Sequence, residues 1–250
     1  MTVTLFDAHT GFGGLGKAQR EPVPLDDLLE AIDRLDIAGA LVRTLPDDLE
    51  RDWPGANGIL YDTCAANERL VPCPVLVPNT GDDYPPEEEQ VADAIAHGAG
   101  AAWLRPGKDS WVIRDWACGR LFRTLQDRRL PAFLLHRDLA LEQVGDLADT
   151  YPELPFILAG VDFRHQRTLL PLLETFPNVH AATGKQFALH RGIEQLCDKI
   201  GAERILFGTG FPESEPGMAV TQLAYAEIPD PARAAIGAGN LERLMEGIRR

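Results

Sequence analysis

Short hydrophobic runs alternate with amphipathic segments along the whole chain. Eight runs of six to eight residues are mostly apolar and too short to be buried helices, so each predicts a strand. The segments between them repeat apolar residues at helical spacing, and several end in glycine or are followed by proline, which predicts helices. The predicted strands are 3–9, 38–44, 71–78, 101–106, 131–136, 155–160, 178–183 and 204–209, and the clearest helical segments are 25–35, 86–98, 139–151, 166–176 and 190–201.

This alternation predicts the fold class. Strands and helices that alternate eight times indicate a parallel sheet closed into a (β/α)8 TIM barrel, an α/β fold. A length of 250 residues is typical of one such barrel and no stretch looks like a linker, so we expect a single domain over residues 1–250. The acidic stretch 79–90 fits a strand-to-helix loop and a helix whose negative first turn favours its dipole.

Charge and composition narrow the classes of function. The chain has 38 acidic and 24 basic residues, and its formal net charge of −14 disfavours nucleic acid and anionic membrane surfaces as partners. The N-terminus lacks the features of a signal peptide, and no stretch approaches the roughly 18 to 20 apolar residues of a membrane span. Cys64, Cys73, Cys118 and Cys197 form no CxxC pair and are typical of reduced thiols. We therefore expect a cytoplasmic protein.

Polar residues stand at the carboxyl ends of the predicted strands, where a (β/α)8 barrel builds its active site. His9 and His136 end the first and fifth strands, and both could point toward the barrel axis, although a lone histidine there is often a structural core residue. Basic residues at the same ends predict a local positive field suited to a carboxylate or phosphate, unless they form structural ion pairs. The other polar residues are Asp7, Arg43, Asn79, Arg105, Arg137, Asp162, Arg164, Thr183, Lys185 and Thr209.

Four segments carry recognisable motifs. They are FDAHTGF at 6–12, FPNVHAATG at 176–184, GIEQLCDKIGAERILFGTGFP at 192–212 and AAIGAGNLERLM at 234–245. These segments resemble motifs of the amidohydrolase-related proteins, a branch of the amidohydrolase superfamily that includes metal-dependent decarboxylases and lactone hydrolases. The resemblance implies a TIM barrel with a metal site made of two histidines on the first strand, one each on the fifth and sixth, and an aspartate on the eighth.

When these ligand positions are carried over to this sequence, two of the ligands are present, His9 and His136. The second histidine of the first strand falls on Gly11, the histidine of the sixth strand on Gly160 and the aspartate on Gly210. A hydrolytic zinc site needs about three protein ligands and a bound water, and in this family the aspartate is expected to take the proton of that water. We therefore expect no metal cofactor, with zinc or manganese at a reduced site on His9 and His136 as the alternative.

Two further interpretations of the site stay open. His165 and Asp162 lie just beyond the sixth predicted strand and could supply a third ligand position. The segment GFGGLGKA at 11–18 fits a phosphate-binding G-x-x-x-x-G-K loop, but Ala18 stands where Ser or Thr would hold magnesium. Two prolines soon afterwards disfavour the long helix that such a loop needs, so we prefer a glycine-rich loop over the barrel mouth.

The sequence leaves three functions open. Glycines at three converging positions leave space in a core that apolar side chains would normally refill, which favours a barrel that has lost metal-dependent hydrolysis. Such a protein would bind a small anionic ligand or support an intact relative as a partner subunit, and it could form either a homodimer or a hetero-complex with that relative. The second function is a metal-independent acid–base enzyme with a carboxylate-bearing substrate, and the third is a hydrolase, lactonase or decarboxylase with a reduced metal site. The catalytic candidates are His9, His136 and Asp7, and the ligand-binding candidates are Arg43, Arg105, Arg137, Arg164, Thr183 and Lys185.

Overall fold

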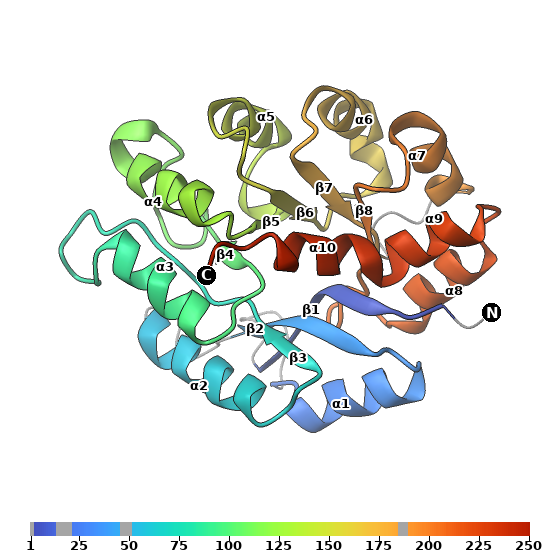
Figure 1. Ribbon diagram of the computed structural model, residues 1–250, viewed down its shortest axis with the longest axis horizontal. Helices are drawn as coiled ribbons and strands as arrows, with labels where there is room; N and C mark the ends of the chain where they lie inside the picture. Colours follow the sequence, from blue (N-terminus) through green and yellow to red (C-terminus); the bar gives the residue numbers. More distant parts are fainter. Residues whose placement is uncertain (1–2, 14–21, 46–51, 185–189) are drawn as a thin grey trace.

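The computed structural model describes residues 3–13, 22–45, 52–184 and 190–250, and it has the predicted alternation of strands and helices. The strands lie side by side in parallel, and the helices surround them (Figure 1). The α/β class and the (β/α)8 barrel are confirmed. The strands are β1 (Phe6–Gly13), β2 (Gly39–Leu45), β3 (Leu70–Pro72), β4 (Ala102–Leu104), β5 (Ala132–Leu135), β6 (Phe156–Ala159), β7 (Val179–Ala182) and β8 (Ile205–Leu206).

The helices follow the strands in order, and the last three close the chain after β8. Two single turns, η1 (His136–Asp138) and η2 (Phe163–His165), follow β5 and β6, and a π-helical turn, η4 (Ala235–Gly239), joins α9 to α10. The α-helices are α1 (Leu25–Arg34), α2 (Trp53–Ala65), α3 (Glu87–Ala96), α4 (Asp115–Arg128), α5 (Leu141–Thr150), α6 (Gln166–Thr175), α7 (Gly192–Ile200), α8 (Gly217–Tyr225), α9 (Asp230–Ala234) and α10 (Asn240–Glu246).

Backbone hydrogen bonds join two parallel sheets, β1-β2-β3 and β4 to β8, into the barrel. At one seam Trp103 N donates to Pro74 O at 2.7 Å, and at the other Ala8 N donates to Phe207 O at 2.8 Å. The third strand ends earlier than predicted because its segment contains several prolines, which lack the N–H that a ladder needs. The eighth strand is also shorter than predicted. The Phe207 N–H donates its hydrogen bond to Ile236 O and not to a neighbouring strand.

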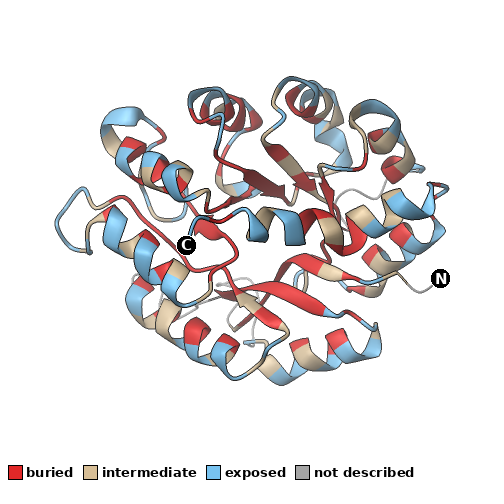
Figure 2. Cartoon of the chain, viewed as in Figure 1, coloured by how far each residue is buried: buried red, intermediate tan, exposed pale blue. Residues whose placement is uncertain are grey.

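The core lies in two layers, one inside the barrel and one between the strands and helices. Buried residues cover the strands and the inward sides of the helices (Figure 2). Inside the barrel, Leu241 of α10 belongs to the same buried cluster as Leu41 and Ala101, near the amino ends of β2 and β4. Helix α10 therefore covers the amino end of the barrel (Figure 1), and the site is sought at the carboxyl ends of the strands. No helix among the described residues is long and apolar enough to cross a membrane.

Candidate functional site

Asp7 joins the first strand to the end of the eighth. Its Oδ1 accepts hydrogen bonds of 2.9 Å from the backbone N–H groups of His9 and Thr209, and its Oδ2 accepts one from the Thr209 hydroxyl. The side chain is buried, and this burial raises the pKa of Asp7 from its ordinary value of 3.8 to about 6. Both carboxylate oxygens are thus engaged in holding the strand ends that carry His9 and Gly210.

His9 lies inside the mouth of the barrel and is only 4% exposed. Its ring centroid is 5.7 Å from that of Phe133, and its carbonyl oxygen accepts a hydrogen bond of 2.8 Å from Gly210 N. Burial lowers the pKa of His9 well below its ordinary value, and the positive charges of Arg43 and Arg137 lower it further. The imidazole is therefore neutral at pH 7.

Gly210 and Gly160 each leave room for a Cβ without a clash among the described residues. Their φ angles are +72° and +74°, a region that side chains rarely adopt. A Cβ on Gly160 would meet only Leu135 Cδ2 within 4 Å among the described residues, at 3.8 Å. A Cβ on Gly210 would stand 3.8 Å from His9 Cε1, which is an ordinary van der Waals distance. The space beside Gly210 is thus directly next to the His9 ring.

Arg43 is a buried cation that contacts two aromatic rings. Its Cζ lies 4.7 Å from the Trp103 ring centroid and 4.8 Å from that of Phe133, and its Nε donates to Thr10 O at 3.3 Å. Among the described residues, Arg43 has no ion pair with a carboxylate and its Nη1 has no hydrogen-bond partner. Burial lowers the pKa of Arg43 to about 10. The charges of Glu213 and Asp7 act on Arg43 from beyond ion-pair distance, so the buried guanidinium has no direct carboxylate contact among the described residues.

Arg105 is also buried, but a carboxylate neutralises it. Its Nε and Nη2 donate to the two carboxylate oxygens of Asp109 at 3.1 Å and 2.8 Å. Its Cζ stacks 4.1 Å from the Trp53 ring and 4.7 Å from the Trp103 ring. Arg43 and Arg105 thus both contact Trp103, and only Arg43 lacks a described carboxylate partner.

The other predicted rim cations lie outward in ion pairs. Arg137 Nη1 lies 2.5 Å from Glu213 Oε1, and Arg164 Nη1 lies 3.3 Å from Asp162 Oδ2. Structural ion pairs, which the sequence left as the alternative to a positive rim, therefore account for these two residues. Thr183 is buried, with its hydroxyl donating to Leu206 O at 3.1 Å.

Two predicted elements of the rim fall on undescribed parts of the chain. Lys185 lies outside the described residues, and so does most of the glycine-rich segment 11–18. Its first residues, Gly11 to Gly13, form the end of β1 and pair in parallel with β2. The glycine-rich loop over the mouth therefore stays a prediction.

His136 meets His165 at the ends of β5 and β6. Their ring centroids are 4.3 Å apart in an edge-on arrangement, and His165 Nδ1 lies 3.2 Å from Asp162 Oδ1. Burial lowers the pKa of His136, and the neighbouring His165 ring lowers it further. The structure thus gives the two predicted histidines different ring partners, Phe133 for His9 and His165 for His136.

Aromatic residues line a cavity of about 530 Å³ at the same end of the barrel. Trp53, Tyr84 and Trp111 form its aromatic part, and Thr80 and Lys108 are among its polar residues. The sequence analysis did not single these residues out, although each follows one of the predicted strands, which is the signal that could have found them.

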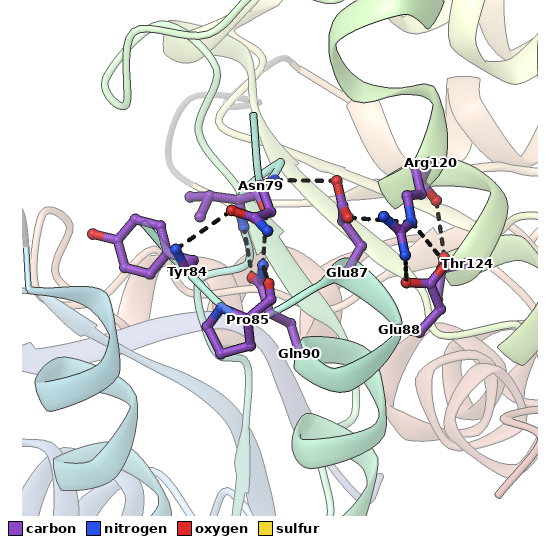
Figure 3. A network of polar contacts seen from close by, with 9 residues as sticks. Asn79, Tyr84, Pro85, Glu87, Glu88, Gln90, Arg120 and Thr124 are labelled. Carbon is purple, nitrogen blue, oxygen red and sulfur yellow. Dashed lines mark hydrogen bonds and ion pairs between the residues drawn. The ribbon is translucent and has the colours of Figure 1, made fainter. Parts of the chain in front are cut away.

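A network of polar contacts holds the loop that forms one wall of this cavity (Figure 3). Glu87 Oε1 accepts a hydrogen bond of 3.1 Å from Asn79 N, and Tyr84 N donates to Asn79 Oδ1 at 3.4 Å. Arg120 of α4 lies 3.5 Å from Glu87 Oε2 and 2.7 Å from Glu88 Oε2. The acidic stretch is therefore a loop and a helix start, as predicted, and it is tied to the neighbouring helix.

Comparison with known proteins decides the family. The model of the Amidohydrolase family matches residues 15–247, nearly the whole chain. The chain belongs to this amidohydrolase family. The family resemblance is thereby confirmed, and three of the four sequence motifs, at 176–184, 192–212 and 234–245, lie within the matched residues. No curated protein sequence matches the chain.

Solved structures of amidohydrolase relatives share the fold at low sequence identity. A 2,6-dihydroxybenzoate decarboxylase from Rhizobium is 16% identical with a TM-score of 0.73, covering 98% of this chain and 99% of its own. A 5-carboxyvanillate decarboxylase from Sphingomonas paucimobilis is 13% identical with a TM-score of 0.75, at 98% and 99% coverage. A dihydroxybenzoic acid decarboxylase from Polaromonas sp. JS666, with bound manganese and the inhibitor 2-nitroresorcinol, is 16% identical with a TM-score of 0.72, at 98% and 97% coverage.

The residues of this amidohydrolase do not fit the metal site that the resemblance implies. In the described part of the chain, no three His, Cys, Asp or Glu side chains are grouped so that they could hold a metal ion. His165 and Asp162 therefore do not complete a rebuilt site there. The Arg43 charge acts on His9, and a dication beside that imidazole would be repelled by the same charge.

Proposed function

We propose that this amidohydrolase binds a small carboxylate-bearing ligand in the mouth of its barrel without the metal of its family, and that it has lost metal-dependent hydrolysis. The observation that carries the proposal is the buried Arg43 guanidinium, which has no carboxylate within ion-pair distance among the described residues and an Nη1 without a hydrogen bond. An uncompensated buried charge destabilises a fold. A ligand anion would supply the missing charge.

The surroundings of Arg43 suit such a ligand. A guanidinium presents paired N–H donors that match the two oxygens of a carboxylate. The rings of Trp103 and Phe133 both contact the guanidinium, and this packing restrains it before a ligand binds, which reduces the entropy lost on binding. The space beside Gly210 adds room next to His9. Relatives with this fold act on 2,6-dihydroxybenzoate and 5-carboxyvanillate, which makes aromatic carboxylates the first ligands to try.

The candidate residues then divide by role. Arg43 would hold the ligand carboxylate, and the neutral His9 ring would contact it through a hydrogen bond. Asp7 and Thr209 would position His9 through its backbone. Arg105 would stay bound to Asp109, and its guanidinium would support the Trp103 ring by stacking on it. The rim candidates Arg137, Arg164, Thr183 and Lys185, and His136 at the end of β5, are left as secondary contacts.

A metal-independent acid–base reaction on the bound carboxylate is the second candidate function. Its support is that His9 is neutral at pH 7 and borders the room that the missing side chain of Gly210 leaves. A neutral imidazole can accept a proton from a ligand group within hydrogen-bond reach. Support of a partner subunit stays a prediction.

Isothermal titration calorimetry with 2,6-dihydroxybenzoate, in buffer containing EDTA, tests the proposal. Saturable binding is expected for the wild type, and Arg43→Met should weaken it at least tenfold because the carboxylate loses its charged partner. Arg43→Lys should be intermediate, because it keeps the charge and loses the paired donors. Arg123→Met, which removes an exposed arginine of α4, is the control and should bind like the wild type. Unchanged affinity in Arg43→Met would refute the proposal.

A further inference from the structure

Ser214 is a buried hydroxyl in the segment between β8 and α8. It is 4% exposed, and its backbone N donates to Gly210 O at 3.0 Å, which folds the segment back on the end of the barrel. The hydroxyl oxygen has no hydrogen-bond partner among the described residues. Buried hydroxyls are nearly always hydrogen-bonded, because an unpaired one destabilises the fold, so this one needs an explanation.

The hydroxyl faces the space that glycine leaves at position 210. A Cβ on Gly210 would stand 3.4 Å from Ser214 Oγ and 3.8 Å from His9 Cε1, so both groups border the same gap. An aspartate, as the resemblance implies for this position, would fill the gap and could itself accept a hydrogen bond from a hydroxyl there. With glycine, the gap lies between a hydroxyl and an imidazole edge.

Arg43 is within electrostatic reach of residues beside this gap. Its charge acts on His9, and the charge of Glu213, the residue before Ser214, acts on Arg43. A group that enters the gap is therefore within the field of a buried positive charge. The group that satisfies a hydroxyl donor and a guanidinium together is an acceptor with negative charge, such as a carboxylate.

We infer that Ser214 is a ligand-binding residue of this amidohydrolase and that its hydroxyl donates a hydrogen bond to a carboxylate oxygen of the ligand in the gap beside Gly210. The inference rests on the proposed function, since it requires that an anion bind near Arg43. It adds a contact that neither the sequence motifs nor the family resemblance supplies. Ser214 takes part in the site from the segment that follows the position of the lost aspartate.

Replacement of the hydroxyl tests the inference. Ser214→Ala removes an unpaired group, so the melting temperature of the ligand-free protein should stay unchanged or rise, whereas a structural serine would lower it. The affinity for 2,6-dihydroxybenzoate in EDTA should fall roughly tenfold, as expected for a hydrogen bond to a charged group. Thr221→Ala removes an exposed hydroxyl of α8 that donates to Gly217 O, and it should leave the affinity unchanged.

A second variant fills the gap. Gly210→Asn keeps a residue type that tolerates positive φ, and its side chain should occupy the space and weaken binding of the probe at least tenfold with the fold intact. If Ser214→Ala binds like the wild type while Arg43→Met does not bind, the inference is wrong and the proposed function stands. If Ser214→Ala lowers the melting temperature and leaves affinity unchanged, the serine is structural. If the wild type does not bind the probe, both are wrong.

Discussion

At the scale of single residues, Asp7 and Arg43 are buried ionisable groups whose charged forms the fold disfavours. Burial raises the pKa of Asp7 to about 6 and lowers that of Arg43 to about 10. Asp7 is compensated by three hydrogen bonds from His9 and Thr209, and it stabilises the junction of β1 with β8. The direct contacts of the Arg43 guanidinium among the described residues are two aromatic rings and one backbone carbonyl, and Glu213 and Asp7 act on it only from a greater distance, which is why we assign it to a ligand.

The raised pKa of Asp7 predicts a pH dependence of stability. The folded state holds the Asp7 proton to higher pH than the unfolded state does, so this contribution to the free energy of unfolding falls as the pH rises from about 4 to above 6. Asp7→Asn keeps an oxygen that can accept hydrogen bonds from the backbone N–H groups, but its amide does not ionise. The stability of Asp7→Asn relative to the wild type should rise by up to about 3 kcal/mol between pH 4 and pH 7 in urea unfolding. A difference that does not vary with pH would contradict this.

The buried Arg43 charge should make the ligand-free protein less stable than the Arg43→Met variant. Methionine has a similar length and no charge, so Arg43→Met should raise the free energy of unfolding by about 1 to 3 kcal/mol while it abolishes ligand binding. The exposed control Arg123→Met should stay within about 0.5 kcal/mol of the wild type. Denaturant unfolding of the ligand-free proteins measures both. A destabilised Arg43→Met would indicate that the guanidinium has a structural partner.

The sequence predicted some residues of the site and missed others, for a physical reason. His9 and Arg43 stand on strands with clear apolar patterns, so their places at the barrel mouth followed from the strand ends. Ser214 and the cavity residue Tyr84 stand on loops, where no periodicity indicates direction, and Trp53 is the first residue of α2, directly after such a loop. Ion pairs could not be predicted from the sequence either, because the partner of Arg137 is Glu213, which lies far away in the sequence.

At the scale of elements, the loop between β3 and α3 is fixed by side chains and not by regular structure. Glu87 binds the backbone of Asn79, and Gln90 Nε2 donates to Val77 O at 3.0 Å and Pro85 O at 2.8 Å (Figure 3). The sequence predicted strand order and helix identity from periodicity. It did not predict where β3 ends, because prolines interrupt the ladder within an apolar run.

Two neighbouring glutamates of α3 should differ in their effect on this loop. Glu87 is buried and accepts from Asn79 N, so Glu87→Ala should lower the free energy of unfolding by about 1 to 2 kcal/mol. Glu88 pairs with Arg120 at the surface, so Glu88→Ala should change it by less than about 0.5 kcal/mol. Thermal unfolding of both variants provides the comparison. Equal effects would mean that the network does not hold the loop.

At the scale of the whole molecule, the barrel has one covered end and one end with the site. Helix α10 packs on the amino end, and the buried cations and the cavity lie at the carboxyl end. The net charge of −14 repels anions at long range, so ligand specificity must come from the local field of Arg43. The family is shown by a model that matches residues 15–247, and a structure with the same fold is a manganese-bound decarboxylase, whereas the described residues of this chain contain no group of three side chains that could hold a metal ion.

The loss of metal ligands predicts how the protein responds to metal ions. A bound ion present at a hundred times its dissociation constant would stabilise the folded state by about 2.7 kcal/mol, which is visible as a rise in melting temperature. Manganese and zinc should produce no saturable rise in the wild type beyond that of His9→Ala. Elemental analysis of protein purified without chelators should find less than stoichiometric metal. A stoichiometric ion that is lost in His9→Ala or His136→Ala would contradict the prediction.

The central claim is that Arg43 holds an anion where relatives use a metal. Its most direct test is the dissociation constant of 2,6-dihydroxybenzoate, measured by titration calorimetry once in EDTA and once in excess manganese. The account predicts saturable binding with the same dissociation constant under both conditions. Binding that appears only with manganese would show that the ligand is held by a metal after all, and it would contradict the account.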